Sequence, residues 1–262
     1  MAFKTALFVV SVILTITTNN IKDVVAKPPN KITGGFEAEI TEFPAMASIK
    51  YKKSHICGGA IISKNKILTA AHCLTNENKK TGQLTITPVE LITVGTGNKI
   101  STEMKNIYRV KKLDIHDGYT GDMEENACDI AIITLMENIV EDSTQKVISL
   151  PQRDAEIGAS AFVAGWGSER EYGQASPLLK KAPMLVISNA QCRSEINDKI
   201  ISGHLCAIYK RGVGFCDGDS GGPLMSNGEV IGIVSMSIDC GKGHPDIYTR
   251  VYSYIDWIRN RI

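Results

Sequence analysis

The stretch "VGFCDGDSGGP", residues 213–223, places a serine in a setting that could support nucleophilic chemistry. A free serine hydroxyl is a weak nucleophile. Ser220 would therefore need a base within hydrogen-bond reach, a group that orients this base, and donors for an oxyanion. Gly218 and Gly221 could help to supply the donors, because glycine adopts turns that expose backbone N–H groups. Taken alone, the stretch fits a polar turn equally well, so the partners of the serine must decide.

The best candidate for the base is His72, which lies in the run "LTAAHC" (68–73). A disulfide at the adjoining cysteine would hold the backbone of this imidazole rigidly. A histidine beside a cysteine is also commonly structural, so this context alone leaves both interpretations open. The remaining histidines lie in polar stretches and are expected at the surface: His55, His116, His204 and His244.

A different arrangement is suggested by Gly218, Ser220 and Gly222, which also fit G-x-S-x-G, the nucleophile elbow of α/β-hydrolases. That fold needs a helix directly after the serine, and its acid and histidine follow downstream. Here Gly221-Gly222-Pro223 opposes a helix, and only 42 residues (262 − 220) follow the serine. The base is therefore expected upstream.

The elements that would position these groups are short apolar, β-branched runs separated by Gly, Asn, Asp and Pro. They cover residues 58–63, 66–71, 91–96, 130–136, 146–150, 160–166, 184–188, 228–237 and 246–251. Short strands at this spacing predict a β-sandwich or β-barrels. Only the end of the chain, residues 251–262, has apolar residues at helical spacing.

The N-terminus has the pattern of a secretory signal peptide. Lys4 precedes an apolar run over residues 6–17, which is too short to span a bilayer. Cleavage is expected after Thr18 or after Ala26, and residues 1–26 are predicted to be removed. The protein is then secreted and extracellular. A net charge of +1 gives no indication of nucleic acid or membrane as a partner.

Seven cysteines in a secreted chain predict disulfides, with one cysteine left over. Zinc is disfavoured, because the sequence has no C-x-x-C pair and His72 directly precedes Cys73.

Four motifs, "CGGAIISKNKILTAAHC", "CDIAIITL", "CDGDSGGPL" and "IVSMS…IYTRV", together resemble the chymotrypsin/trypsin family of serine endopeptidases. The match runs from Ile32 to the C-terminus, and arthropod secreted members, including serine collagenases, are similar. The resemblance implies an all-β fold of two six-stranded antiparallel β-barrels, split near residues 145–150, with a C-terminal helix. It also implies hydrolysis of peptide bonds through an acyl-enzyme.

Carried over to this sequence, the resemblance makes Ser220 the nucleophile, His72 the general base and Asp129 the buried acid that orients it. The backbone N–H groups of Gly218 and Ser220 would form the oxyanion hole. Ser235 would support the acid. An inactive homologue that serves as a binding module is the alternative, but such proteins usually lack the serine or the histidine.

The resemblance also implies a zymogen. Residues 27–31 would form a short activation propeptide, and residues 32–262 the protease domain. Cleavage after Lys31 would free the amine of Ile32, which would pair with Asp219 and turn the Gly218 N–H toward the oxyanion hole.

The family pairs its cysteines as Cys57–Cys73, Cys192–Cys206 and Cys216–Cys240. Cys128 has no family partner and is expected to be a small buried residue, with an intermolecular disulfide as the alternative.

The specificity pocket departs from the trypsin pattern. Gly214 stands where trypsins carry an aspartate, whereas Asp246 stands on the facing wall where a small residue is usual, as in some arthropod serine collagenases. Asp217 is expected at the rim, the Ser235–Ser237 backbone along an extended substrate, and Met236 in place of a usual Trp. We predict broad specificity for basic and large apolar residues. If Asp246 lies outside the pocket, the preference would be chymotrypsin-like.

The expected partners are protein or peptide substrates, an activating trypsin-like protease and protein protease inhibitors, and the protein is expected to be a monomer. No cofactor is expected. No metal is expected either, since the segment 97–116 holds only Glu103 and Asp114 as acids and a calcium site needs several oxygen ligands.

Overall fold

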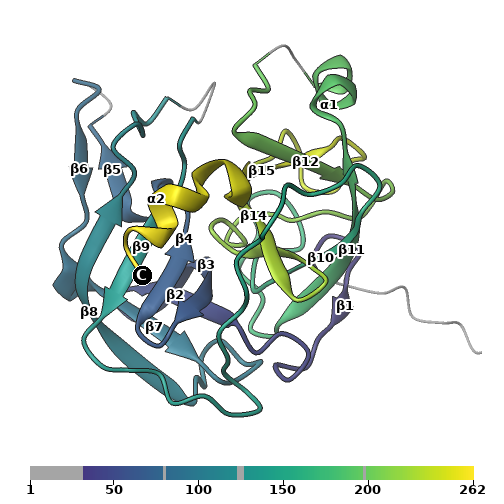
Figure 1. Cartoon of the computed structure of the whole chain (residues 1–262). Coiled ribbons are helices and arrows are strands. Elements are labelled where there is room, and N and C mark those ends of the chain that lie inside the picture. Colours follow the sequence, from purple (N-terminus) through teal and green to yellow (C-terminus); the bar gives the residue numbers. More distant parts are fainter. Residues whose placement is uncertain (1–31, 79–80, 123–126, 197–198) are drawn as a thin grey trace, which may run out of the picture.

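The structure is a computed structural model that describes residues 32–78, 81–122, 127–196 and 199–262. The expected signal peptide and propeptide, with Lys31, lie outside the described residues. Figure 1 shows the strands in two groups beside each other. The first strand, β1 (Phe36–Glu37), lies with the second group, and from there the chain completes the first group before it enters the second.

The first group is a closed barrel in which neighbouring strands are antiparallel and follow the order β2-β3-β4-β9-β8-β7. Its strands are β2 (Met46–Tyr51), β3 (Ser54–Ser63), β4 (Lys66–Thr69), β7 (Ile92–Thr96), β8 (Asn106–Ile115) and β9 (Ala131–Leu135). Smaller elements flank it: η1 (His72–Leu74), η2 (Val89–Leu91) and a hairpin of β5 (Thr75–Glu77) and β6 (Leu84–Ile86).

The second group runs β11-β10-β13-β14-β15-β12 and closes because β12 also pairs with β11. Its strands are β10 (Ser160–Gly165), β11 (Lys180–Ile187), β12 (His204–Ile208), β13 (Pro223–Ser226), β14 (Glu229–Met236) and β15 (Asp246–Arg250), with β1 (Phe36–Glu37) added to β11. Two closed six-stranded antiparallel barrels are confirmed.

Each barrel encloses its own apolar core, and strand alternation supplies it. In β8, Tyr108 and Val110 are buried while their neighbours Ile107 and Arg109 are exposed, as the period of two requires. The second core contains Val163, Leu205 and Tyr248. Barrel closure leaves neither sheet with long open edges.

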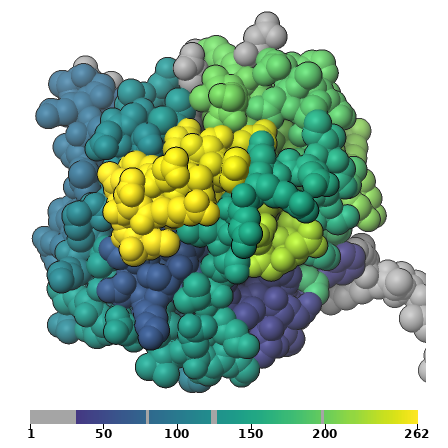
Figure 2. All heavy atoms as spheres, in the orientation of Figure 1, coloured from purple at the N-terminus to yellow at the C-terminus, as the bar shows by residue number. Residues whose placement is uncertain are grey.

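The C-terminal segment forms η3 (Val251–Tyr254) and α2 (Ile255–Arg259). Val251 and Ile258 pack into the core of the first barrel, and Figure 2 shows this yellow segment lying over the blue strands of that barrel. The chain therefore returns from the second barrel to cover the first. None of the helices in the described ranges has the length and apolar composition needed to cross a membrane.

The expectation that only the end of the chain is helical is wrong, because α1 (Asn189–Glu195) is also a helix. Ser188 caps it by accepting a hydrogen bond from the Gln191 amide. Seven residues make about two turns, which is too short to produce a clear apolar period.

Three disulfides join Cys57 to Cys73, Cys192 to Cys206, and Cys216 to Cys240, and these pairs coincide with the expected ones. Cys128 is a free thiol, but it is half-buried rather than fully buried.

Candidate active site

His72 and Asp129 are brought together by the pairing of β4 with β9. His72 follows the end of β4, Asp129 precedes β9, and the two strands are antiparallel neighbours. The carboxylate accepts two hydrogen bonds from the histidine, one from Nδ1 at 2.8 Å and one from the backbone amide at 2.9 Å. This double contact sets both the position and the ring orientation of His72.

The second barrel completes the environment of Asp129. Ser235 Oγ donates to the carboxylate at 2.7 Å, and Thr249 Oγ1 donates to the backbone carbonyl of the aspartate at 2.7 Å. Burial alone would raise the pKa of Asp129, but His72 and the hydrogen bonds outweigh it and lower the pKa. The acid therefore stays ionised although it is fully buried.

Burial and Asp129 act on His72 in opposite directions. Burial disfavours the imidazolium, but the charge and the hydrogen bond of Asp129 outweigh it, so the pKa of His72 lies above its ordinary value. Its Nε2 lies 3.8 Å from Sγ of Cys73. In the described part of the chain no hydrogen bond joins Nε2 to the Ser220 hydroxyl. Catalytic hydrogen bonds of this kind commonly tighten only when substrate is bound.

The loop that carries Ser220 is fixed by its backbone. The Ser220 carbonyl accepts from the Gly58 amide at 2.8 Å, and the Gly221 amide donates to Val234 at 2.8 Å. Gly58 adjoins Cys57, which the disulfide ties to the residue after His72. The amides of Gly218 and Ser220 donate to no group within the described residues, so both are available to an incoming oxygen.

His55 is a functional neighbour that the sequence reading missed. Its ring accepts from or donates to Ser48 Oγ at 2.8 Å through Nδ1, and Nε2 lies 3.0 Å from the carbonyl oxygen of Gly218. Burial lowers the pKa of His55 to about 4, so the ring is neutral and its Nε2–H donates to Gly218. It thereby holds the backbone beside the available amides.

The expected surface position of the other histidines is wrong for His55 and for His204, which is 1% exposed. His116 is half-buried against the rings of Tyr254 and Trp257. An imidazole has apolar faces, so a polar sequence context does not require exposure. One signal in the sequence could have indicated that His55 is not a surface residue: it stands two residues before Cys57 in an apolar strand.

Asp219 is fully buried beside Ser220. Its carboxylate accepts from the amides of Gly167 at 2.7 Å and Cys216 at 3.0 Å. An added Cβ at Gly167 would lie 2.4 Å from this carboxylate, so only glycine permits the approach. Burial raises the pKa of Asp219 to about 7, and no cationic side chain among the described residues pairs with it.

The new N-terminus that cleavage would create begins in the same region. Ile32 is fully buried in the core of the second barrel, together with Val213 and Phe215. Thr33 forms an antiparallel bridge with Gly214.

The structure brings Asp246 next to Gly214. An added Cβ at Gly214 would lie 2.9 Å from Oδ2 of Asp246, and this oxygen accepts from the Phe215 amide at 3.1 Å. Asp246 is 2% exposed, and burial raises its pKa well above the ordinary value, with the Asp219 charge adding to the effect. The carboxylate thus fills the space that glycine leaves open.

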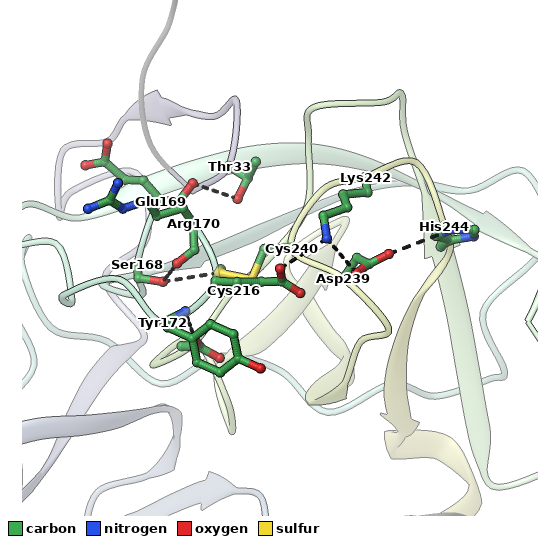
Figure 3. Close-up of polar contacts among 12 residues, drawn as sticks. Thr33, Ser168, Glu169, Arg170, Tyr172, Cys216, Asp239, Cys240, Lys242 and His244 are labelled. Atoms are coloured by element: carbon green, nitrogen blue, oxygen red, sulfur yellow. Dashed lines mark hydrogen bonds and ion pairs between the residues drawn. A yellow bond between two sulfur atoms is a disulfide. The ribbon is translucent and has the colours of Figure 1, made fainter.

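Asp217 is exposed and holds a neighbouring loop through a hydrogen bond. It accepts from the Tyr172 amide at 2.8 Å. Figure 3 shows Lys242 and Asp239 beside the Cys216–Cys240 disulfide. The Lys242 ammonium pairs with Glu171 as well as with Asp239. Met236 and Ser237 are half-buried at the end of β14.

Among the residues that the structure describes, two groups of side chains have the proximity that metal binding requires, Cys57–His72–Cys73 and Cys216–Asp217–Cys240. In each group both sulfurs belong to a disulfide. Metal ligation needs thiolate, so neither group fits a metal ion.

Known proteins resemble this chain in sequence and in fold. The family model described as Trypsin matches residues 32–258. Chymotrypsin-2 of Vespa crabro is 32% identical over 229 residues, which cover 87% of this chain and 98% of that protein. Among solved structures, human heparin binding protein has a TM-score of 0.73 and 30% identity, covering 87% of this chain and 95% of that one. Neuropsin, a serine protease of mouse brain, has a TM-score of 0.77 and 27% identity, covering 86% and 97%. The chain therefore belongs to the trypsin family and is a serine endopeptidase.

Proposed function

We propose that Ser220, His72 and Asp129 form the catalytic triad of this endopeptidase. The observation that carries the proposal is the pair of hydrogen bonds from His72 to one buried, ionised carboxylate. The available amides of Gly218 and Ser220 beside the serine support it. Labelling of the activated protein by a fluorophosphonate tests the assignment: Ser220→Ala must abolish labelling, whereas labelling that survives this change would refute it.

In the proposed mechanism, Ser220 Oγ attacks the scissile carbonyl while Nε2 of His72 accepts its proton. Asp129 holds the Nδ1–H tautomer and stabilises the imidazolium. The Gly218 and Ser220 amides receive the developing oxyanion, and each such donor typically contributes about 3–4 kcal/mol. His72 then protonates the leaving amine, and water hydrolyses the acyl-enzyme.

The enzyme is proposed to be a zymogen activated by a trypsin-like protease after Lys31. Asp219 supports this, because it is buried with no cationic side chain beside it in the part of the chain that the structure describes, and the free amine of Ile32 would provide a cation. The burial of the Ile32 side chain in the core of the second barrel supports this start of the protease domain. Lys31→Gln should leave the precursor inactive after trypsin treatment. Full activity of the uncut chain would overturn the proposal.

Primary specificity is proposed to include basic as well as large apolar residues, with Asp246 as the acid and Asp217 at the pocket rim. The contact between Asp246 and Gly214 supports a position of Asp246 in the pocket wall. Asp246→Gly should lose cleavage after Lys and Arg while cleavage after Leu, Phe and Tyr persists. Equal cleavage after Arg by parent and variant would exclude Asp246 as the specificity acid.

Residues 1–26 are proposed to be a signal peptide, and the mature enzyme to be a secreted monomer. The three disulfides support this, since disulfides persist in oxidising compartments. Protein protease inhibitors are its proposed partners besides substrates. Mass spectrometry of the secreted chain tests where the signal is cut.

A further inference from the structure

The backbone around Asp129 forms a tight turn just before β9. The Ile130 amide donates to the Cys128 carbonyl at 2.7 Å, which closes a turn of three residues centred on the acid. Cys128 has a φ of 58°, in the left-handed region that residues other than glycine seldom adopt. Such a conformation persists only where the surrounding structure enforces it. The direction of the Asp129 carboxylate therefore depends on the groups that hold this turn.

Two groups from the end of the chain hold the turn. The hydroxyl oxygen of Tyr254 accepts a hydrogen bond from the Cys128 amide at 3.2 Å, and no other acceptor for this amide lies among the described residues. Thr249 Oγ1 donates to the Asp129 carbonyl at 2.7 Å. Both groups are at least 120 residues away from the turn along the chain, so the fold and not the local sequence supplies the support.

The position of the Tyr254 side chain is itself defined by its neighbours. The His116 ring meets the Tyr254 ring edge-on, with 5.2 Å between centroids and 80° between planes. Gly203, which is buried between α1 and β12, leaves room for the hydroxyl, because an added Cβ there would lie 2.6 Å from the hydroxyl oxygen. The φ of Gly203 is not positive, so glycine is needed at this position for space rather than for backbone conformation.

We propose that Tyr254 is a positioning residue for the acid of the triad. Its hydroxyl holds the Cys128 amide and thereby sets the direction in which the Asp129 carboxylate faces His72. This inference rests on the proposed function, in which Asp129 is the triad acid. The C-terminal segment, which packs against the core of the first barrel, then contributes to the rate of the reaction as well as to the stability of the fold.

The first test is Tyr254→Phe, which removes the hydroxyl and keeps the ring. Activated enzyme is assayed with a peptide amide, and rates are normalised to active sites titrated to completion with a fluorophosphonate. Loss of one neutral hydrogen bond should lower kcat by about 3- to 10-fold, with KM unchanged, because the carboxylate acts when the proton is transferred. Tyr252→Phe is the matched control, since Tyr252 lies in the same η3 turn and is 38% exposed; its kcat should equal that of the parent.

A purely structural role of Tyr254 would give a different result. It would lower Tm and the number of active sites while kcat per active site stayed equal to that of the Tyr252→Phe control, and this outcome would overturn the inference.

Gly203→Ala tests the same contact from the other partner. The added methyl group should displace the Tyr254 hydroxyl and lower kcat about as much as Tyr254→Phe does. Added to Tyr254→Phe, it should cause no further loss, because no hydroxyl remains to be displaced. Losses that multiply in the double variant would show that the two residues act independently and would overturn the inference.

His72→Ala separates this inference from the proposed function on which it rests. Loss of nearly all activity in His72→Ala, together with unchanged kcat in Tyr254→Phe, would overturn only the role of Tyr254. Full activity in His72→Ala would refute the proposed triad and the role of Tyr254 with it.

Discussion

Buried carboxylates occupy contrasting environments in the two halves of this enzyme. Asp129, beside the first barrel, accepts hydrogen bonds from His72 and Ser235, and its pKa is lowered. Within the described ranges, Asp219 and Asp246 of the second barrel accept only from backbone amides, and their pKa values are raised. The difference is one of partners, because all three side chains are almost fully buried.

This contrast indicates that a buried carboxylate can have either of two roles, depending on its partners. In the proposed function, Asp129 with its several donors is a fixed part of the proton-transfer machinery before any substrate arrives. A carboxylate that lacks a cation is instead poised for one from outside its own segment. In the proposed function those cations are the Ile32 amine for Asp219 and the substrate side chain for Asp246.

The largest expected effect comes from neutralising Asp129, the acid that accepts hydrogen bonds from His72 and Ser235. Asp129→Asn should lower kcat by about 10⁴-fold, because the amide favours the wrong tautomer of His72. Kinetics with one peptide substrate measure it. A loss of less than about 10-fold would show that the hydrogen bonds of Asp129 do not matter for proton transfer.

The pH profile is the matching measurement on the unaltered enzyme. Only neutral His72 accepts the serine proton, so activity appears as pH rises through the pKa of this histidine. Because Asp129 raises that pKa, the midpoint should lie above about 6.5, the unperturbed value. A profile that stays flat down to pH 4 would contradict the role of His72.

The next prediction concerns how the effect of Asp219 on stability changes when the chain is cleaved after Lys31. It uses a Ser220→Ala background, which prevents self-digestion. With a folded-state pKa of about 7, the uncut protein binds a proton that the unfolded chain releases near pH 4. Its stability should therefore fall as pH rises from about 4 to 7, by up to about 4 kcal/mol.

The cleaved form should escape this loss, because its new amine keeps Asp219 ionised. Urea unfolding of both forms across this pH range measures the difference. Parallel pH curves for the two forms would argue against the Asp219–Ile32 pair.

A smaller effect is expected from Ser235→Ala, which removes one of several hydrogen bonds to Asp129. A hydrogen bond to a charged group contributes about 1.5–3 kcal/mol. The two hydrogen bonds from His72 would still stabilise the Asp129 carboxylate after this change, so kcat/KM should fall by only about 10-fold. Ser237→Ala is the control in the same segment. A loss as large as that of Asp129→Asn would mean that Ser235 has a further role.

The smallest effect is expected from Lys242→Ala, on the exposed ion pairs beside the pocket. The Lys242 side chain is 53% exposed, and exposed pairs contribute at most about 1 kcal/mol. Both Tm and kcat/KM should change little at moderate salt. A large loss of activity would show that the loop bridged to Glu171 shapes the pocket.

Short strands and turn residues are local signals, so the sequence pattern was sufficient to predict an all-β fold, either a sandwich or barrels. The two six-stranded barrels were predicted from the family resemblance. The runs at 58–63, 160–166 and 246–251 coincide with β3, β10 and β15. The helix α1 was missed, and so were strands such as β12, whose five residues contain a histidine and a cysteine. Elements this short are decided by packing in the barrel rather than by their own periodicity.

The sequence by itself determined which residue types are available for chemistry and their order along the chain: His72, then Asp129, then Ser220. Only the tertiary structure decided their surroundings. The partners of Asp129 come from three distant segments. Asp219 and Asp246 are equally buried, but the donors that the described residues give them are backbone amides. The contacts of His55 and Phe215 arise from strands and loops that are remote in sequence. Hydrogen bonding and desolvation depend on distances in space, which no single stretch of sequence encodes.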